Sequence, residues 1–109
     1  MKKKRLSNDL TDAIAIDCEM VGAGENGQKS MLARVSIVNF LGKCIYDEYV
    51  LPMEPVTDYR TRFSGIRPFN LTRKNGAKNF KIVRIEVMEI INGRLLIGHD
   101  VEKDLDVLS

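Results

Sequence analysis

The chain has 109 residues, of which 44% are hydrophobic and 29% are charged, and its formal net charge is +2. This composition is typical of one globular domain, or part of one, and it excludes a disordered chain. No apolar run approaches the ~20 residues that a membrane span requires, which excludes a transmembrane protein and argues against a membrane partner.

A basic cluster of Lys2, Lys3, Lys4 and Arg5 stands near the start of the chain. We expect residues 1–12 to form a flexible lead-in. A run of this kind is typical of a solvated tail, and the alternative interpretation is a signal for nuclear import.

The first predicted element is a buried strand over residues 13–20, with the sequence AIAIDCEM. Its alternation places Ile14, Ile16 and Cys18 on one face. Asp17 and Glu19 share the opposite face with two small alanines.

After this strand the pattern predicts a meander followed by an α/β crossover. The expected elements are a Gly-rich loop at 22–30, strands at 32–40 and 43–51 joined around Leu41 and Gly42, loop over 52–79 with one helical turn near 64–66, a helix over 80–92, a strand over 94–99, and a helix over 101–108 capped by Asp100. The order β-β-β-α-β-α assigns the chain to the α/β class.

Two carboxylates on an otherwise apolar strand are the first candidates for chemistry. Because Asp17 and Glu19 are two residues apart, a strand directs both to one side. Each uncompensated charge on a buried strand costs several kcal/mol, and a divalent cation such as Mg²⁺, which takes carboxylate ligands, is the simplest compensation. The alternative is that both acids project into water at the end of the strand.

A third acid, Asp104, lies within the apolar stripe of the last predicted helix, with Val101 and Leu105 before and after it and Leu108 a turn further on. We expect the strand at 94–99 to lie beside the Asp17 strand, so that the helix carries Asp104 back towards the first two carboxylates. The alternative is an acid at the edge of the stripe, paired with a nearby Lys or Arg.

These motifs carry a family resemblance that covers residues 13 to 109. IDCEMVG at 16–22 resembles the first motif of the DEDDh exonucleases in the eukaryotic RNA exonuclease and interferon-stimulated exonuclease group, and GHDVEKDLDVL at 98–108 is similar to their second motif. SMLARVSIVN, YDEYVLP and VTDYRTRFSGIRP resemble the blocks between them, in the same order. The resemblance implies a ribonuclease-H-like fold and a 3′→5′ exonuclease acting on RNA or single-stranded nucleic acid. It also implies a role in RNA processing, specifically of rRNA, in the nucleus and nucleolus.

The resemblance also assigns roles to residues. It implies that Asp17, Glu19 and Asp104 are the catalytic residues and the ligands of two Mg²⁺ or Mn²⁺ ions, in a two-metal mechanism. The implied substrate contacts are Met20, Val21, Ser64 and Gly65. Apart from the resemblance, Arg34 and Ser36 share one strand face that we expect to approach substrate. Thr61 belongs to a basic, aromatic-bearing loop at 59–62 that is interpreted as a phosphate-binding loop or, alternatively, as a solvated loop with a structural Tyr. Ser64 and Gly65 would offer backbone donors near the 3′ terminus. Arg34 is equally well interpreted as a structural ion-pair partner.

The family has a third motif, in which a histidine is followed five residues later by an aspartate and supplies the general base and a fourth metal ligand. We find no such motif after the second one, and we expect His99, which belongs to the second motif, not to be the base. Residues 13–109 are therefore expected to form a C-terminally truncated exonuclease domain, with an uncovered sheet edge open to self-association. The alternative function is a catalytically incompetent form that binds nucleic acid or a protein partner.

Overall fold

The computed structural model describes residues 9–109, so most of the predicted lead-in, including its basic cluster, lies outside the described residues. Residues 9–12 are bonded to the sheet. The Asp9 carbonyl accepts a hydrogen bond of 2.9 Å from the Asn39 side chain, and the Asp12 carbonyl accepts one of 2.9 Å from Leu95 N–H. The chain is thus anchored before its first strand begins.

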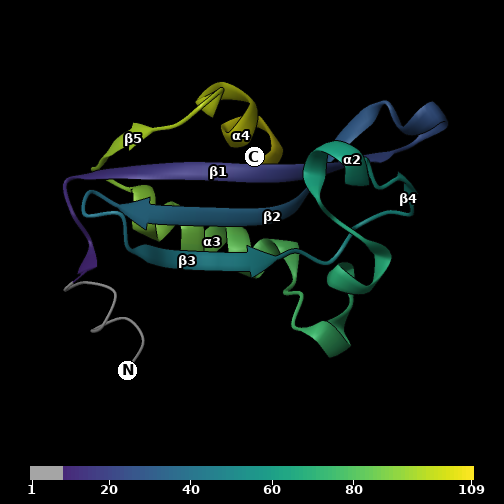
Figure 1. Cartoon of the computed structure of the whole chain (residues 1–109), viewed down its shortest axis with the longest axis horizontal. Helices are drawn as coiled ribbons and strands as arrows, with labels where there is room; N and C mark the ends of the chain where they lie inside the picture. Colours follow the sequence, from purple (N-terminus) through teal and green to yellow (C-terminus); the bar gives the residue numbers. More distant parts are fainter. Residues whose placement is uncertain (1–8) are drawn as a thin grey trace.

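One twisted sheet organises the molecule (Figure 1). Its centre is β1 (Ala13–Ala23), which pairs antiparallel with β2 (Lys29–Asn39), and β2 pairs antiparallel with β3 (Cys44–Tyr49). On the other side of β1, β5 (Leu95–Ile97) pairs parallel with its first half and β4 (Val56–Asp58) pairs antiparallel with its end. The predicted meander and crossover are confirmed, whereas β4 was not predicted.

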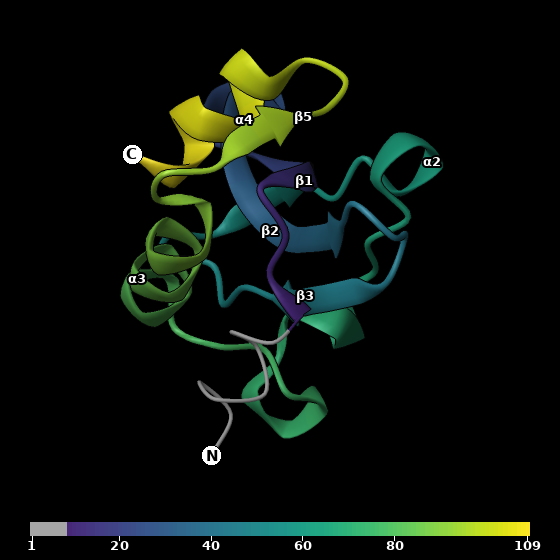
Figure 2. The ribbon, with the colours of Figure 1, turned by 90° about the vertical axis from the view of Figure 1, so that its left-hand side faces the viewer.

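Helix α3 (Phe80–Ile91) covers one face of the sheet (Figure 2). It begins after Asn79, whose side chain accepts from Lys81 N–H at 2.8 Å, and it ends before Gly93, which has a φ of 75°. Both ends agree with the helix predicted over 80–92. Among residues 9–109, no helix has the length and apolarity to cross a bilayer.

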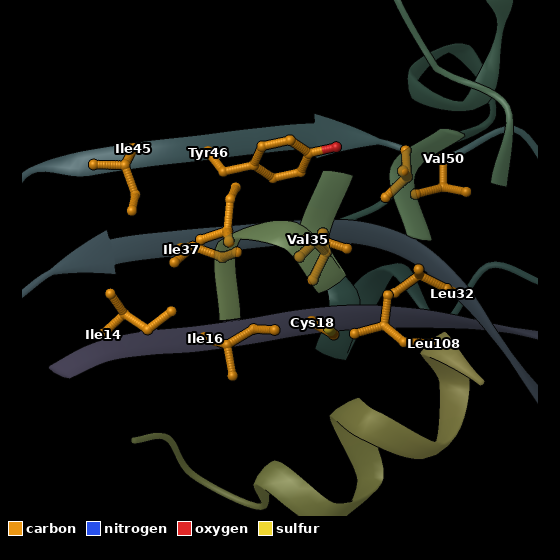
Figure 3. Packing of buried hydrophobic residues seen from close by; sticks show 13 residues of the cluster. Ile14, Ile16, Cys18, Leu32, Val35, Ile37, Ile45, Tyr46, Val50 and Leu108 are labelled. Carbon is orange, nitrogen blue, oxygen red and sulfur yellow. The ribbon is translucent and has the colours of Figure 1, made fainter. Parts of the chain in front are cut away.

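The core lies between α3 and the sheet (Figure 3). The predicted alternation of β1 is confirmed, since Ile14, Ile16 and Cys18 are buried in this core and Asp17 is exposed. The buried residues of the cluster are Ile14, Ile16, Cys18, Leu32, Val35, Ile37, Ile45, Tyr46, Val50, Val83, Val87, Ile90 and Leu108. Burial of this many apolar side chains, at about 1.5–3 kcal/mol for each large one, is the main stabilisation of the fold.

The segment predicted as loop over 52–79 contains more structure than expected. Besides β4 it forms α2 (Thr61–Ser64) and two 3₁₀ turns, η2 (Pro68–Leu71) and η3 (Arg73–Asn75). Ile66 and Leu71 anchor it in a second core cluster. The other members of this cluster are Val21, Ala23, Met31 and Ala33.

The loop predicted over 22–30 is shorter in the structure. Strand β1 continues to Ala23, β2 starts at Lys29, and a 3₁₀ turn, η1 (Glu25–Gly27), connects them. Polar composition alone therefore underestimated the length of both strands.

Helix α4 (Val101–Leu108) lies beside β1 with Leu108 fully buried. The predicted side-chain cap by Asp100 is wrong. Asp100 has a left-handed backbone, with φ of 60°, and its side chain makes no capping hydrogen bond, because an N-cap side chain needs an extended backbone to reach the helix. Its carboxylate instead pairs with Lys103 at 3.4 Å. Leu105 is 36% exposed, so its predicted place in the buried stripe is also wrong.

Candidate active site

A gap in strand pairing along one side of β1 defines the site. β5 pairs with residues 13–15 of β1 and β4 pairs with Gly22 and Ala23. Between them, residues 16–21 have no strand partner on that side among the described residues, and α4 contacts β1 there. Beside Asp17 and Glu19, helix α4 thus takes the place that a neighbouring strand would otherwise have.

Gly98 allows the connection from β5 to α4 to pass against β1. A Cβ atom at Gly98 would lie 2.6 Å from the carbonyl oxygen of Ile16 and 3.0 Å from Cγ2 of Val101. No side chain fits this space, so glycine is required for the close approach. The consequence is that α4 starts directly beside the acidic part of β1.

Asp104 is the buried acid of the site, at 3% exposure. Its carboxylate accepts a hydrogen bond from the backbone N–H of Cys18, on the unpaired stretch of β1. Its Oδ2 atom is buried and has no hydrogen-bond partner among the residues that the structure describes. In the described part of the chain no Lys or Arg forms a salt bridge with Asp104. The structure therefore shows the predicted approach of Asp104 to β1, and it does not show the alternative, an ion pair with a basic residue.

The three carboxylates repel one another. Burial, followed by the charge of Asp17, raises the pKa of Asp104 to about 6. Burial and then Asp17 also raise the pKa of Glu19, and Arg34 opposes this shift. Burial, followed by the charge of Asp104, raises the pKa of the Cys18 thiol. The site therefore holds an excess of negative charge.

This excess charge fits a divalent cation. Hard cations such as Mg²⁺ favour carboxylate oxygens, and no donor in the described part of the chain reaches the buried Oδ2 of Asp104. Between residues 9 and 109, no three side chains of His, Cys, Asp or Glu are arranged to hold a metal ion on their own as they stand. The ligand atoms thus suit a metal ion, but the side chains are not arranged in the geometry of a complete coordination site.

The face of the sheet that carries the acids continues onto β2 and β3. Ser36 pairs in register with Asp17, and Arg34 with Glu19. The Arg34 guanidinium makes two bonds to Asp47, of 2.8 and 2.7 Å, and Ser36 Oγ donates to the same carboxylate at 3.3 Å. Of the two interpretations of Arg34, the structural ion pair is the one the structure shows. Asp47 was missed, although the register of the predicted hairpin places it opposite Ser36.

The site residues predicted on α2 are used within their own turn. Thr61 Oγ1 donates to the Ile66 carbonyl at 2.5 Å. The backbone N–H of Ser64 donates to Arg60 O at 2.8 Å, and that of Gly65 to Thr61 O at 2.9 Å. The expectation that Ser64 and Gly65 offer free backbone donors is therefore wrong, because the turn consumes them.

The remaining predicted residues lie around the acids. Met20 packs against the main core and is half-buried, whereas the Val21 side chain is fully buried in the second cluster. A β-bulge interrupts the register directly after Glu19, and it increases the local twist. His99 is exposed in the connection between β5 and α4.

Comparison with known sequences places this geometry in context. A family model described as Exonuclease matches residues 14–109. The chain is 56% identical over 108 residues to RNA exonuclease 4 of Mus musculus and 57% identical over 106 residues to that of Homo sapiens. These matches cover 99% and 97% of this chain and 24% of each relative. The chain thus spans about a quarter of the length of the curated relatives it matches.

Solved structures show the same fold. The pseudoubiquitin hydrolase–RNA exonuclease module of Saccharomyces cerevisiae Pan2, in complex with AAUUAA RNA, aligns with a TM-score of 0.77 at 23% identity, over 92% of this chain and 19% of that chain. The catalytic unit of Neurospora crassa Pan2 aligns with a TM-score of 0.77 at 27% identity, over 89% and 17%. The predicted ribonuclease-H-like exonuclease fold is confirmed.

Proposed function

This chain belongs to the exonuclease family, and from that premise we propose that it contributes the active site of a 3′→5′ exonuclease that shortens RNA or other single-stranded nucleic acid. The observation that carries the proposal is the convergence of Asp17 and Glu19 on β1 with the buried Asp104 on α4. Such a cluster of acids, in which Asp104 has no basic partner among residues 9–109, destabilises the fold, so it is explained by a ligand.

Asp17, Glu19 and Asp104 are the residues that would hold Mg²⁺ or Mn²⁺, as two ions. When bound, these ions polarise the scissile phosphate and lower the pKa of water. The chain's own part is positioning. The Cys18 N–H holds the Asp104 carboxylate against β1, and Asp47 holds the Arg34 guanidinium to one side of Glu19. We propose RNA processing, specifically of rRNA in the nucleolus, as the biological setting, on the strength of the RNA exonuclease relatives.

A second function is favoured by one observation. The chain has a single histidine, His99, and it is exposed in the β5–α4 connection and not directed at the acids by any hydrogen bond in the described part of the chain. Phosphodiester hydrolysis benefits from a positioned general base. The alternative is therefore that this chain binds nucleic acid or a protein partner without cleaving.

Degradation of a 5′-labelled single-stranded RNA by the purified chain tests the proposal. We expect a ladder that shortens from the 3′ end with Mg²⁺ or Mn²⁺, and no ladder with EDTA. Asp17→Asn is expected to lower the rate at least about a hundredfold, since a metal site supplies several kcal/mol of transition-state stabilisation. Glu102→Gln, which removes an exposed acid from the same helix as Asp104, is expected to cleave like the wild type.

Two results would contradict this assignment. Shortening that persists in EDTA or in Asp17→Asn would show that the carboxylates do not carry the reaction. A second result is that no ladder forms, although the chain binds both Mn²⁺ and RNA and Asp17→Asn weakens this binding. That result would favour the binding-only alternative for this chain.

A further inference from the structure

A long stretch of the chain carries positive charge without any acid. From Tyr59 to Ile85 there is no Asp or Glu, although the chain as a whole has 15 of them. The same stretch holds Arg60, Arg62, Arg67, Arg73, Lys74, Lys78, Lys81 and Arg84. Charge separation of this kind along one segment is an electrostatic footprint for a polyanion.

Three of these cations are engaged within the protein. Lys78 pairs with Glu48 at 3.2 Å and with Glu86 at 3.3 Å. The Arg60 guanidinium donates to Ser30 Oγ and to the Gly27 carbonyl, and Arg84 donates to the Leu108 carbonyl. Four others are exposed, and within the described part of the chain they form no salt bridge. They are Arg62, Arg67, Arg73 and Lys74.

Two exposed aromatic side chains are interleaved with these cations. Phe63 on α2 is 86% exposed and Phe69 on η2 is 57% exposed. Their exposure does not result from a loosely held segment. Ile66 and Leu71, on either side of Phe69, are buried in the second core cluster. The segment is anchored to the sheet and presents both rings to solvent.

The position of the segment relates it to the acids. α2 and α3 lie on opposite sides of the sheet (Figure 2). Asp17 and Glu19 point to the same side as α2, because the alternate residues of β1 face the core under α3. From there α2, η2 and η3 follow one another from the end of β1 past the end of β3 (Figure 1). The segment therefore leads away from the acidic site along the surface.

We propose that α2, η2 and η3 form a basic-aromatic track for a single-stranded polynucleotide, consisting of Arg62, Phe63, Arg67, Phe69, Arg73 and Lys74. Phe63 and Phe69 stack on unpaired bases, and the four cations bind the phosphates between them. Alternation of cations and exposed rings is the chemistry of single-strand binding, because stacking on a side chain requires an unpaired base. The track extends the proposed function, on which its direction rests, by holding nucleotides upstream of the 3′ end.

The test measures equilibrium binding of fluorescent RNA to the full chain in EDTA, where metal-dependent hydrolysis does not occur. We use oligonucleotides of about three and about twelve nucleotides, on either side of the length that one such site covers. Phe63→Ala is expected to raise the Kd of the longer RNA about tenfold and to leave the Kd of the shorter one unchanged. The double variant Arg73→Gln/Lys74→Gln is expected to lower the slope of log K against log salt by about 1.4, at roughly 0.7 per lost phosphate contact.

The hairpin between β2 and β3, at the other end of the sheet, supplies matched controls (Figure 1). Phe40 there is 74% exposed, and Lys43 is an exposed cation that, unlike the cations of the track, already pairs with Asp9 at 2.9 Å. Phe40→Ala and Lys43→Gln are expected to change neither the Kd nor the salt slope. A loss as large with Phe40→Ala as with Phe63→Ala would overturn the track.

Other ligands and the proposed function are separated by further arms. For single-stranded DNA of the same sequence, the variants are expected to lose as much affinity as they do for RNA, because the track binds bases and phosphates. A loss of affinity confined to RNA would overturn the proposal that bases and phosphates are the groups bound. Polyglutamate that binds as tightly as RNA, with no effect of Phe63→Ala, would show a surface for acidic proteins instead. Binding that depends on Phe63 without hydrolysis contradicts only the exonuclease assignment, whereas hydrolysis with binding that does not depend on Phe63 contradicts only the track.

Discussion

The metal-free chain is expected to become more stable when Asp104 is replaced by asparagine, by about 1–3 kcal/mol at pH 8. Burial and the charge of Asp17 raise the pKa of Asp104 from 3.8 to about 6, so the folded state disfavours the ionised carboxylate. The asparagine side chain removes the charge and keeps an oxygen that accepts from Cys18 N–H.

The pH dependence follows from the same shift. A carboxyl whose pKa is higher in the folded state than in the unfolded state contributes stability that is fully present below 3.8 and is lost as the pH rises through about 6. The stability difference between Asp104→Asn and wild type is therefore expected to be largest above pH 6 and to vanish near pH 4. Comparing the two proteins at each pH removes the opposing contribution of Asp47, whose pKa is lowered by Arg34.

Urea unfolding of both proteins in EDTA between pH 4 and pH 8 measures this difference. Asp106→Asn, at an exposed position of the same helix, is the control and is expected to change stability little at any pH. A wild type more stable than Asp104→Asn at pH 8 in EDTA would show that the Asp104 carboxylate has a favourable partner in the protein. With saturating Mn²⁺ the order is expected to reverse, because the ion compensates the charge only in the wild type.

Gly98→Ala is expected to destabilise the chain by about 1–3 kcal/mol and to loosen the site. The added Cβ would approach the Ile16 carbonyl to 2.6 Å, and this neighbour is backbone that cannot rotate away. The connection between β5 and α4 must then move off β1. Because Asp104 is held on β1 through Cys18 N–H, its hydrogen bond weakens as α4 shifts.

Two measurements on Gly98→Ala separate local from general damage. The midpoint of urea unfolding is expected to fall, and hydrogen exchange of the Cys18 amide is expected to accelerate more than that of amides in α3. Ile97→Ala, which shortens an exposed neighbour, serves as the control with a small effect on both. Unchanged protection at Cys18 in Gly98→Ala would mean that the connection does not position Asp104.

The features that were predicted correctly are those with long periodic signals. Alternation along β1 identified the face of Asp17 and Glu19, and apolar spacing with Gly93 after it identified α3. Asp104 was predictable for the same reason, since an acid within an apolar stripe stands out against its period. These signals arise from burial, which repeats along the chain.

The features that were missed depend on individual local contacts, which leave no repeating pattern in the sequence. β4 has three residues and gives no repeating pattern. The single helical turn predicted near 64–66 lies instead at Thr61–Ser64, as α2, because bonds such as Thr61 Oγ1 to Ile66 O fix its place. Asp100 was predicted to cap α4 from its residue type, but its left-handed backbone turns the side chain elsewhere. Residue type alone does not specify which of several local hydrogen bonds forms.

The central place of β1 also has a consequence for assembly during synthesis. β1 and β2 leave the ribosome one after the other and can pair at once, whereas β5 and α4 follow only after α3. Joining Asp104 to Cys18 closes a long loop, which is slow compared with forming the β1–β2 hairpin. Until that closure the acids of β1 face water as ordinary surface charges. A nascent chain is therefore unable to gather all three carboxylates before α4 has docked on β1, so the assembled site reports that this docking has taken place.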